Sequence, residues 1–248
     1  MRIVRYISLL IFCSVHLNSH CQVNADNNCR DLLQKFVADM TRISMPENQK
    51  TYFMKYRVET FNKPKSNNQN SSMSGQVMLS GDKSSFESNI MSSYADDKNG
   101  FLILHNQRKI VWGPGGKNTT GADNFKQLAS LQDSLVKLSY LSVCKNVTVA
   151  GKKNMKFIVL IPNEDIDKSL KVNRLEILFD LDKNMIYSVT TFYNEKSELD
   201  HLVVTYNDLN FNYSGSLFTN AYSKVLNSNG KLKAEYKGYE LIDNRARN

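Results

Sequence analysis

The sequence has little of the chemistry on which catalytic and metal sites depend. It contains only four histidines and four cysteines in 248 residues. The two histidines beyond the first 21 residues, His105 and His201, stand alone in strand-like contexts, without the HxxxH or cysteine-rich spacing of a metal site. No GxSxG nucleophile elbow occurs among the abundant serines. The glycine-rich run at residues 113–116 lacks the Lys-Ser/Thr pair of a phosphate loop, so it predicts a turn.

Carboxylates do occur in pairs, but in contexts that predict turns. The pairs are at residues 96–97, 164–165 and 180 with 182. Paired carboxylates serve catalysis when they face each other across a cleft, whereas an aspartate in a turn bonds local backbone groups. We therefore expect a protein that is not an enzyme and that carries no metal or other cofactor.

The chain also has no apolar run long enough to cross a membrane as a helix. Its N-terminal apolar run, residues 6–17, is shorter than the ~20 residues that a bilayer requires. Arg2 and Arg5 precede this run and give it a positive flank. A positive flank followed by a short apolar run predicts a secretory signal peptide.

Signal cleavage is expected after Cys21, because Ser19 and Cys21 supply the residues at positions −3 and −1. Gln22 is then the first mature residue. Cleavage after Ala25 is an alternative, and a lipoprotein that carries its lipid on Cys21 is another. The signal peptide indicates an exported protein, which we expect in the periplasm.

Removal of residues 1–21 changes both the charge and the cysteine count. The loss of Arg2 and Arg5 lowers the formal net charge from +8 to +6. The remaining basic residues are scattered, which favours a solvated surface near an anionic envelope over a nucleic-acid site. Two cysteines remain, Cys29 and Cys144, and an even pair in an exported chain predicts one disulfide. Two buried free thiols are the alternative.

Residues 50–112 have the pattern of an antiparallel meander. From Tyr52 to Val58, every second residue is apolar and faces one side, which is the period of a half-buried strand. Four further strands are expected, each bounded by Gly, Asn or Asp, at residues 74–79, 84–90, 100–105 and 109–112. One face of such a sheet must be covered by another part of the chain or by a ligand. That face is therefore the best candidate for function.

Two amphipathic helices are predicted as that cover. The first spans residues 29–42, where five apolar side chains recur at helical spacing: Leu32, Leu33, Phe36, Val37 and Met40. The second spans residues 123–140, with Asp123 as its N-cap. A second meander is expected at residues 142–150, 155–161, 174–180, 185–194 and 199–207. In the tail, residues 216–226 predict a short helix, and residues 235–242 predict a last strand or an extended arm.

Several stretches resemble the LolA/LolB-like family, the periplasmic carriers of outer-membrane lipoproteins. Residues 51–61 look like the first long strand of that family. Residues 73–81 (MSGQVMLSG) resemble its next strand, where a glycine precedes alternating apolar residues. Residues 99–112, with NGFLIL and then KIVW, resemble its glycine-led hairpin, and residues 202–211 (LVVTYNDLNF) are similar to its closing strands. The resemblance covers most of residues 26–213.

The resemblance implies a mainly β (α+β) fold. We expect a strongly curved, unclosed antiparallel sheet, a half-barrel, wrapped around the two amphipathic helices, with a C-terminal extension. The expected divisions are a signal peptide at residues 1–21, a LolA-like curved-sheet domain at residues 22–213 and the extension at residues 214–248. In the family, the concave apolar face of this sheet binds acyl chains.

The function implied is that of an exported envelope binding protein that holds a lipid or a lipoprotein acyl chain. The alternative is a structural or interaction component of a bacterial envelope assembly, with the same scaffold filled by its own helices and another envelope protein as partner. No nucleic acid is expected, and the chain is peripheral to the membrane at most. Sheet alternation predicts which side chains share the concave face. The expected groove lining is Tyr52, Met54, Tyr56, Val58, Val77, Leu79, Leu102, Leu104, Leu175, Ile177 and Phe179, and the resemblance adds Arg57.

Overall fold

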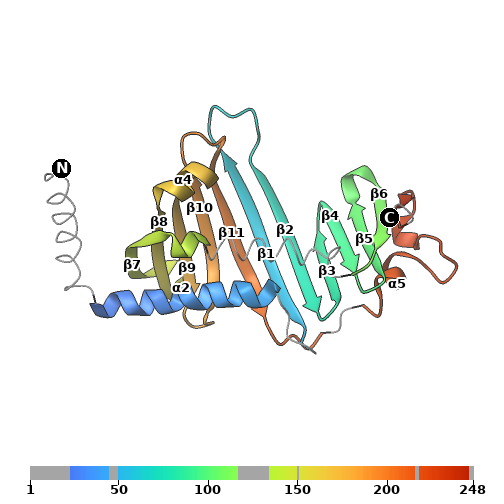
Figure 1. Cartoon of the computed structure of the whole chain (residues 1–248), viewed down its shortest axis with the longest axis horizontal. Helices are drawn as coiled ribbons and strands as arrows, with labels where there is room; N and C mark the ends of the chain where they lie inside the picture. Colours follow the sequence, from blue (N-terminus) through green and yellow to red (C-terminus); the bar gives the residue numbers. More distant parts are fainter. Residues whose placement is uncertain (1–22, 45–49, 117–133, 150, 216–217, 246–248) are drawn as a thin grey trace, which may run out of the picture.

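One open, curved β-sheet organises the part of the chain that the structure describes (Figure 1). The structure is a computed structural model that describes residues 23–44, 50–116, 134–149, 151–215 and 218–245. Within these residues twelve strands form a single sheet in the order β12-β6-β5-β4-β3-β2-β1-β11-β10-β9-β8-β7. The strands are β1 (Tyr52–Asn62), β2 (Ser71–Ser80), β3 (Lys83–Ser88), β4 (Met91–Ala95), β5 (Asn99–Leu104), β6 (Lys109–Pro114), β7 (Ser139–Val149), β8 (Lys152–Pro162), β9 (Val172–Asp180), β10 (Met185–Tyr193), β11 (Leu199–Asn210) and β12 (Glu240–Asp243).

The helices are few, and one of them is long. The described helices are α2 (Val23–Ser44), α4 (Glu164–Leu170), α5 (Ala221–Val225) and the 3₁₀ turns η1 (His105–Gln107) and η2 (Ala234–Tyr236). A further helical turn occupies residues 134–137. In Figure 1, α2 runs across the strands from the β7 side toward β1. None of the described helices is both long enough and apolar enough to span a bilayer.

β1 joins two meanders into this one sheet. It pairs antiparallel with β2 on one side and with β11 on the other. Its register with β11 shifts between Lys55 and Tyr56 and again between Phe61 and Asn62, and two further strand pairs contain similar shifts. Because an extra residue on one strand bends the strand and increases its twist, these shifts account for a strongly curved sheet. The predicted curved, unclosed sheet is therefore confirmed.

The helix α2 covers one face of the sheet, which we call the α2 face. Its Cys29, Leu33 and Phe36 are buried in a cluster with side chains from six strands and the turn before β7. Those partners are Tyr52, Met54, Val77, Leu79, Leu135, Ile158, Leu160, Val172, Leu175, Ile177, Phe179, Ile186, Val189 and Tyr206. The apolar stripe predicted for residues 29–42 thus packs on the sheet as expected.

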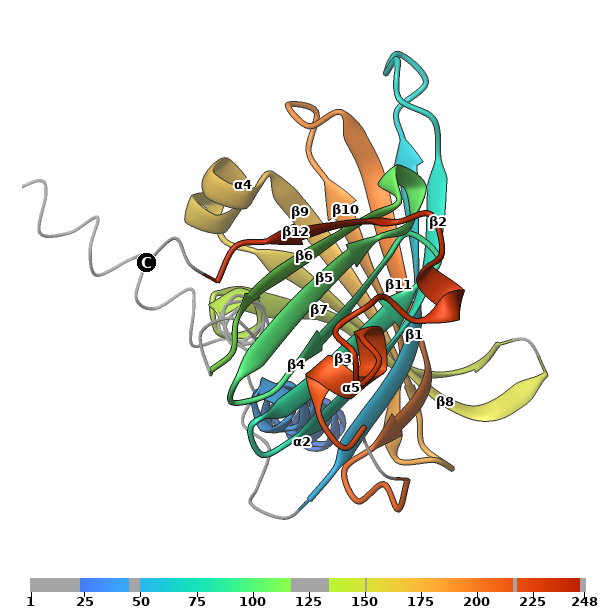
Figure 2. The same ribbon diagram turned by 90° about the vertical axis from the view of Figure 1, so that its right-hand side faces the viewer.

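The C-terminal segment, residues 218–243, covers the opposite face over β4, β5 and β6, which we call the tail face. In Figure 2 this segment lies beside β3 to β6, and β12 runs along β6. The second apolar cluster is built from Tyr94, Phe101, Ile103, Ile110, Trp112, Ala221, Val225, Leu226 and Tyr236. The guanidinium of Arg245 adds a cation–π contact, 3.3 Å from the centre of the Trp112 ring.

A buried carboxylate attaches this segment to the sheet. Asp96, in the turn between β4 and β5, accepts a hydrogen bond of 2.6 Å from the backbone N–H of Ala221. Its other oxygen accepts from the N–H groups of Lys98 and Asn99. Burial acts to raise the pKa of Asp96, but these three N–H groups, that of Ala221 first, outweigh it and lower the pKa. The ionised side chain therefore serves as the connection between the tail and the β4–β5 turn.

Four elements differ from the sequence-based prediction. The strand predicted at residues 84–90 ends at Ser88, whose hydroxyl accepts hydrogen bonds from the N–H groups of Ile90 and Met91, so a turn and the serine-rich strand β4 follow. Residues 164–165 begin α4 instead of forming a turn. β12 pairs in parallel with β6, so the sheet is mixed. Most of the second predicted helix lies outside the described residues, and its last two residues belong to β7.

The predicted disulfide is present. Cys29 of α2 is bonded to Cys144 of β7 with a Cα–Cα distance of 6.3 Å, across a sequence separation of 115 residues. We expect the double variant Cys29→Ser/Cys144→Ser to unfold with a free energy lower by ~2–4 kcal/mol, because the bond restricts the unfolded chain. Urea unfolding of the mature protein measures this loss. A thiol assay on denatured, unreduced wild-type protein should find no free cysteine, and two free thiols per chain would contradict the bond.

Candidate functional site

Seven of the eleven predicted groove residues lie in the core under α2. Tyr52, Met54, Val77, Leu79, Leu175, Ile177 and Phe179 are all buried in the cluster that includes α2. Tyr56 is partly buried against that cluster, and Val58, one step farther along β1, is half-buried. The structure therefore brings most of the predicted set together on one face, and there α2 is its cover.

The two leucines of β5 lie on the same face but outside that cluster. Strand pairing connects Met54 through Val77, Phe86 and Ser93 to Leu102, so these side chains share the α2 face. Leu102 is 37% exposed. Leu104, the next residue of β5 on this face, is half-buried and outside both apolar clusters. The alternation of side chains along a strand predicts correctly which face each residue is on. The length of α2 determines which residues of that face are covered.

Arg57 points the other way. It follows Tyr56 on β1, so it lies on the face opposite α2. Its guanidinium bonds Glu59 at 2.8 Å and the hydroxyl of Ser72 at 3.1 Å. The residue that the family resemblance suggested as groove lining therefore forms a surface ion pair within β1 and a hydrogen bond to β2.

An open cavity of about 770 Å³ lies between α2 and the β7 edge of the sheet, and we call it the α2–β7 cavity. One wall is α2, and the others are the turn at residues 134–138, β7 and β8. The residues that line it are Arg30, Leu33, Gln34, Val37, Ala38, Val136, Lys137, Ser139, Tyr140, Leu141 and Leu160. Its volume falls in the range of about 300–1,000 Å³ typical of small-molecule sites.

Local sequence positions both walls. On α2, Arg30, Gln34 and Ala38 follow one another at four-residue spacing, so they form a single strip of the helix surface. This strip lies beside the buried stripe that contains Leu33. On the other wall, the disulfide fixes β7 against α2 three residues beyond Leu141. The covalent bond therefore sets the separation of the two walls close to the cavity.

The lining combines apolar side chains with cations. Leu33, Val37, Val136, Leu141 and Leu160 supply aliphatic surface, whereas Arg30 and Lys137 are exposed cations, and none of the described lining residues carries a carboxylate. Aliphatic surface favours hydrocarbon by the hydrophobic effect, and a cation near the opening favours an anionic group. The arrangement therefore fits an amphipathic molecule with an apolar chain and a negative head.

Sequence reasoning did not find this cavity. Apart from Leu160, its residues lie on α2, the turn and β7, and none of them belongs to the predicted groove. The sequence signal for it is the strip Arg30-Gln34-Ala38, beside the buried apolar stripe of the helix, together with the disulfide partner Cys144. The predicted disulfide brings these two stretches, more than 100 residues apart, together, and the fold shows that a cavity lies between them.

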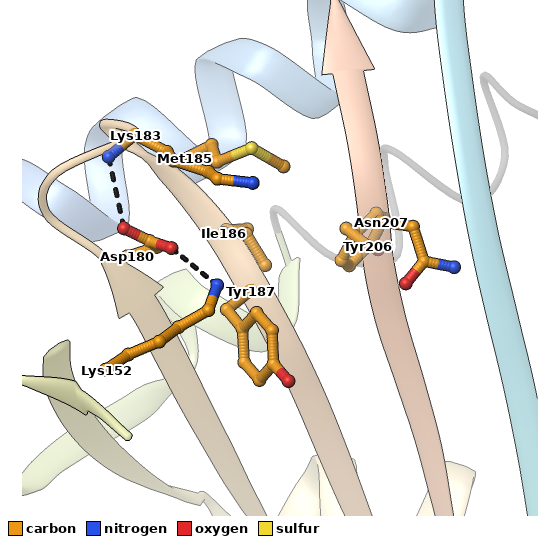
Figure 3. Close-up of a pocket in the computed structure, with 8 residues that line it drawn as sticks. All are labelled: Lys152, Asp180, Lys183, Met185, Ile186, Tyr187, Tyr206 and Asn207. Atoms are coloured by element: carbon orange, nitrogen blue, oxygen red, sulfur yellow. Dashed lines mark hydrogen bonds and ion pairs between the residues drawn. The ribbon is translucent and has the colours of Figure 1, made fainter. Parts of the chain in front are cut away.

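In a second pocket, of about 180 Å³, the acidic and basic side chains of the lining form an ion pair with each other (Figure 3). Asp180 is 4% exposed, and its carboxylate accepts hydrogen bonds of 2.8 Å from Lys152 Nζ and 3.1 Å from the backbone N–H of Lys183. Lys152 Nζ also lies 4.4 Å from the centre of the Tyr187 ring. The bond from Lys152 is the main reason that the pKa of Asp180 is lowered despite burial. The ion pair in this pocket therefore links the start of β8 to the end of β9.

The histidines of the described chain serve structural contacts. His105 lies 2.9 Å from the hydroxyl of Ser92 and 3.2 Å from that of Tyr239, so it connects β4 to the tail. Ser92 is only 5% exposed, which keeps its hydroxyl away from any substrate. His201 stacks on Phe61 with ring centres 4.3 Å apart. Among the described residues there is no group of three or more His, Cys, Asp or Glu side chains with metal-site geometry.

Two aspartate substitutions on the α2 face distinguish a position in the core from a position on the open surface. Met54 is 8% exposed under α2, so Met54→Asp should lower the free energy of unfolding by more than ~3 kcal/mol, because a buried unpaired carboxylate is costly. Leu102→Asp is the matched control on the same face and should change stability by only ~0.5 kcal/mol. Thermal melting compares the two. Equal losses would contradict the placement of α2.

Asp180 makes stability depend on pH. Its pKa is lower in the folded protein, so its contribution is present above its unfolded pKa of ~3.9 and is lost as the pH falls through the folded pKa. We expect Asp180→Asn to be less stable than wild type by ~1–3 kcal/mol at neutral pH. Urea midpoints measured at neutral pH and near pH ~3 should converge at the lower pH. A difference that grows toward acid would contradict this role.

No protein-family model and no curated protein sequence matches the chain. A structure of an uncharacterized conserved protein from Thermus thermophilus matches 85% of this chain and 98% of its own, with 8% identity and a TM-score of 0.40. An outer membrane lipoprotein-sorting protein domain from Vibrio parahaemolyticus matches 77% and 97%, with 12% identity and a TM-score of 0.31. A LolA superfamily protein from Nitrosomonas europaea matches 74% and 94%, with 10% identity and a TM-score of 0.27. All three likenesses have identities of 12% or less and TM-scores of 0.40 or less.

Proposed function

We propose that this chain is an exported envelope protein that binds a lipid or a lipoprotein acyl chain in the α2–β7 cavity. The observation that carries the proposal is an apolar cavity of about 770 Å³ with two cations in its lining. Most of the concave groove expected from the sequence is covered by α2, so the proposed ligand lies at the β7 edge of the sheet and not along its middle.

The lining supports an acyl chain with an anionic group better than it supports a polar ligand. Five aliphatic side chains provide the contact for a hydrocarbon chain, and the transfer of each methylene from water contributes ~0.8 kcal/mol. Gln34 adds a polar side chain to the lining, and Arg30 and Lys137 place positive charge in it. A sugar or a nucleotide would need more converging polar groups than this lining supplies.

Export is the second part of the proposal. The signal peptide predicted for residues 1–21 lies outside the described residues, whereas α2 begins at Val23, one residue after the expected mature start at Gln22. The alternative cleavage after Ala25 falls inside α2. The Cys29–Cys144 disulfide supports an oxidising compartment, which we propose to be the periplasm. N-terminal sequencing of the exported chain determines the cleavage site and detects a lipid on Cys21.

One observation favours the alternative function, an interaction component of an envelope assembly. Phe36 and Leu33 of α2 already occupy the sheet face that would hold an acyl chain in an open half-barrel. A scaffold whose concave face is filled by its own helix can act through its surface alone. The two functions differ in a simple way: only the first places a ligand in the α2–β7 cavity.

A substitution that fills the cavity tests the proposal. Ala38 is exposed and lines the cavity, so Ala38→Phe should reduce the affinity for a fluorescent fatty acid at least ~10-fold by occupying ligand space. Asp31→Phe adds the same ring to an exposed α2 position outside the lining and is the matched control. Fluorescence titration of the mature protein measures both variants, and thermal melting confirms that both fold.

The outcome that contradicts the proposal is equally direct. If the wild-type protein binds no fatty acid and yields no lipid in an organic extract analysed by mass spectrometry, these two results together would favour the alternative function, an interaction component of an envelope assembly. Binding that survives Ala38→Phe unchanged would move the ligand to another surface. Replacement of Lys137 by Ala should weaken binding of a fatty acid more than binding of the corresponding fatty alcohol, because only the acid carries a charge.

A further inference from the structure

At one edge of the sheet, the β7–β8 hairpin turns a row of side chains away from α2 (Figure 1). Ile158 and Leu160 of β8 are buried in the cluster under α2, so the alternate residues of this strand lie on the opposite side. Cross-strand pairing assigns their partners on β7 to that same side. We call this surface the outer hairpin face, and its members are Tyr140, Val143, Lys145, Val147, Met155, Phe157, Val159 and Ile161.

The outer hairpin face is largely apolar, and neither apolar cluster of the described residues includes its members. Tyr140 is 62% exposed, and Phe157 and Ile161 are half-buried. Leu138, two residues before Tyr140, is 46% exposed, and its carbonyl extends the ladder by accepting from the N–H of Asn163 at 2.9 Å. An ordered surface that keeps a tyrosine and a leucine in water has the character of a protein interface, where tyrosine is enriched.

Positive charge accompanies this apolar row. Residues 139–163 contain four lysines and neither aspartate nor glutamate. Lys145 is exposed on the outer hairpin face, where its Nζ lies 5.6 Å from the centre of the Phe157 ring. Lys153, near the tip of the hairpin, is exposed as well. The hairpin therefore favours a partner with negative charge.

The carboxylates of the neighbouring strand β9 are paired within the sheet. Asp180, opposite Met155 in the ladder, accepts a hydrogen bond of 2.8 Å from Lys152. Glu176 lies 3.2 Å from Arg174 Nε, an ion-pair distance. Neither carboxylate is thus engaged with the exposed lysines of the hairpin, and the positive charge there is available to a partner.

We propose that the outer hairpin face docks an acidic polypeptide segment of another protein, whose apolar side chains cover Tyr140 and Leu138 and whose carboxylates meet Lys145. A polypeptide fits this surface better than a bilayer does. Phe157 and Ile161 are half-buried among their neighbours, whereas a membrane takes up side chains that protrude into its interface. The inference goes beyond the proposed function, because it requires no ligand in the α2–β7 cavity.

A binding assay with a synthetic peptide tests the charge. The probe is a fluorescein-labelled peptide of alternating leucine and glutamate, and its counterpart has lysine in place of glutamate. Fluorescence anisotropy should show that the mature protein binds the acidic peptide and not the basic one. Lys145→Glu should weaken this binding about fivefold, because an attraction is replaced by a repulsion. Lys55→Glu, at an exposed position of β1 on the same side of the sheet, is the matched control and should bind like wild type.

A second pair of variants tests the apolar part of the surface. Leu138→Ser should also weaken binding of the acidic peptide about fivefold, given that half of the leucine is already buried. Ile90→Ser, 43% exposed in the β3–β4 turn, is its matched control. Thermal melting confirms that all four variants fold.

Several results would overturn the inference. They are wild-type affinity in Lys145→Glu or Leu138→Ser, equal losses in the control variants, equal binding of the two peptides, and no binding of either. Flotation with phosphatidylglycerol vesicles that is lost in Lys145→Glu would assign the surface to a membrane instead of a polypeptide. A loss of peptide binding with intact fatty-acid binding removes this inference alone, and the reverse result removes the proposed function alone.

Discussion

The pairing of β1 with β11 determines the architecture of the rest of the molecule. It joins the meander β1–β6 to the meander β7–β11, so one sheet of twelve described strands replaces two small ones. Its two edges are β7 and β12. Within the described residues, α2 covers part of the apolar surface of this sheet, and the C-terminal segment packs on the opposite face over β4, β5 and β6. The bulges along β1 and its neighbours then curve the sheet around the helix that is available.

Simple lengths explain where α2 stops. The helix reaches from Cys29, bonded to β7, to Arg42, whose Nε donates to the hydroxyl of Tyr52 on β1. These 13 residue steps span roughly 20 Å at 1.5 Å each. Five strand steps from β7 to β1 span about 24 Å along the sheet, and less across the chord of a curve. The helix therefore fits those strands and cannot extend to β5 and β6, where the tail covers the opposite face instead.

The sequence predicts the parts whose signal is local. The alternation from Tyr52 to Val58, the stripe of the first helix and the pairing of Cys29 with Cys144 are confirmed by the structure. The strand β4 is not predicted, because the sequence Met-Ser-Ser-Tyr-Ala has too little alternation of apolar residues to indicate a strand. Alternation also assigns Leu102 to the correct face, but it cannot tell that a helix of fixed length leaves this leucine uncovered. Coverage is a property of the whole sheet.

The cavity is the part of the site least accessible from sequence, and its origin is physical. Side chains in a protein interior normally close-pack, so two apolar walls that are free to approach each other collapse. Here the separation of α2 from β7 is set next to the cavity by a covalent bond between Cys29 and Cys144, and farther along α2 by the packing of Phe36 in the core. A helix fixed at both points cannot move to fill the space between Val37 and Leu141. The same two constraints that stabilise the fold therefore preserve the room that a ligand would need.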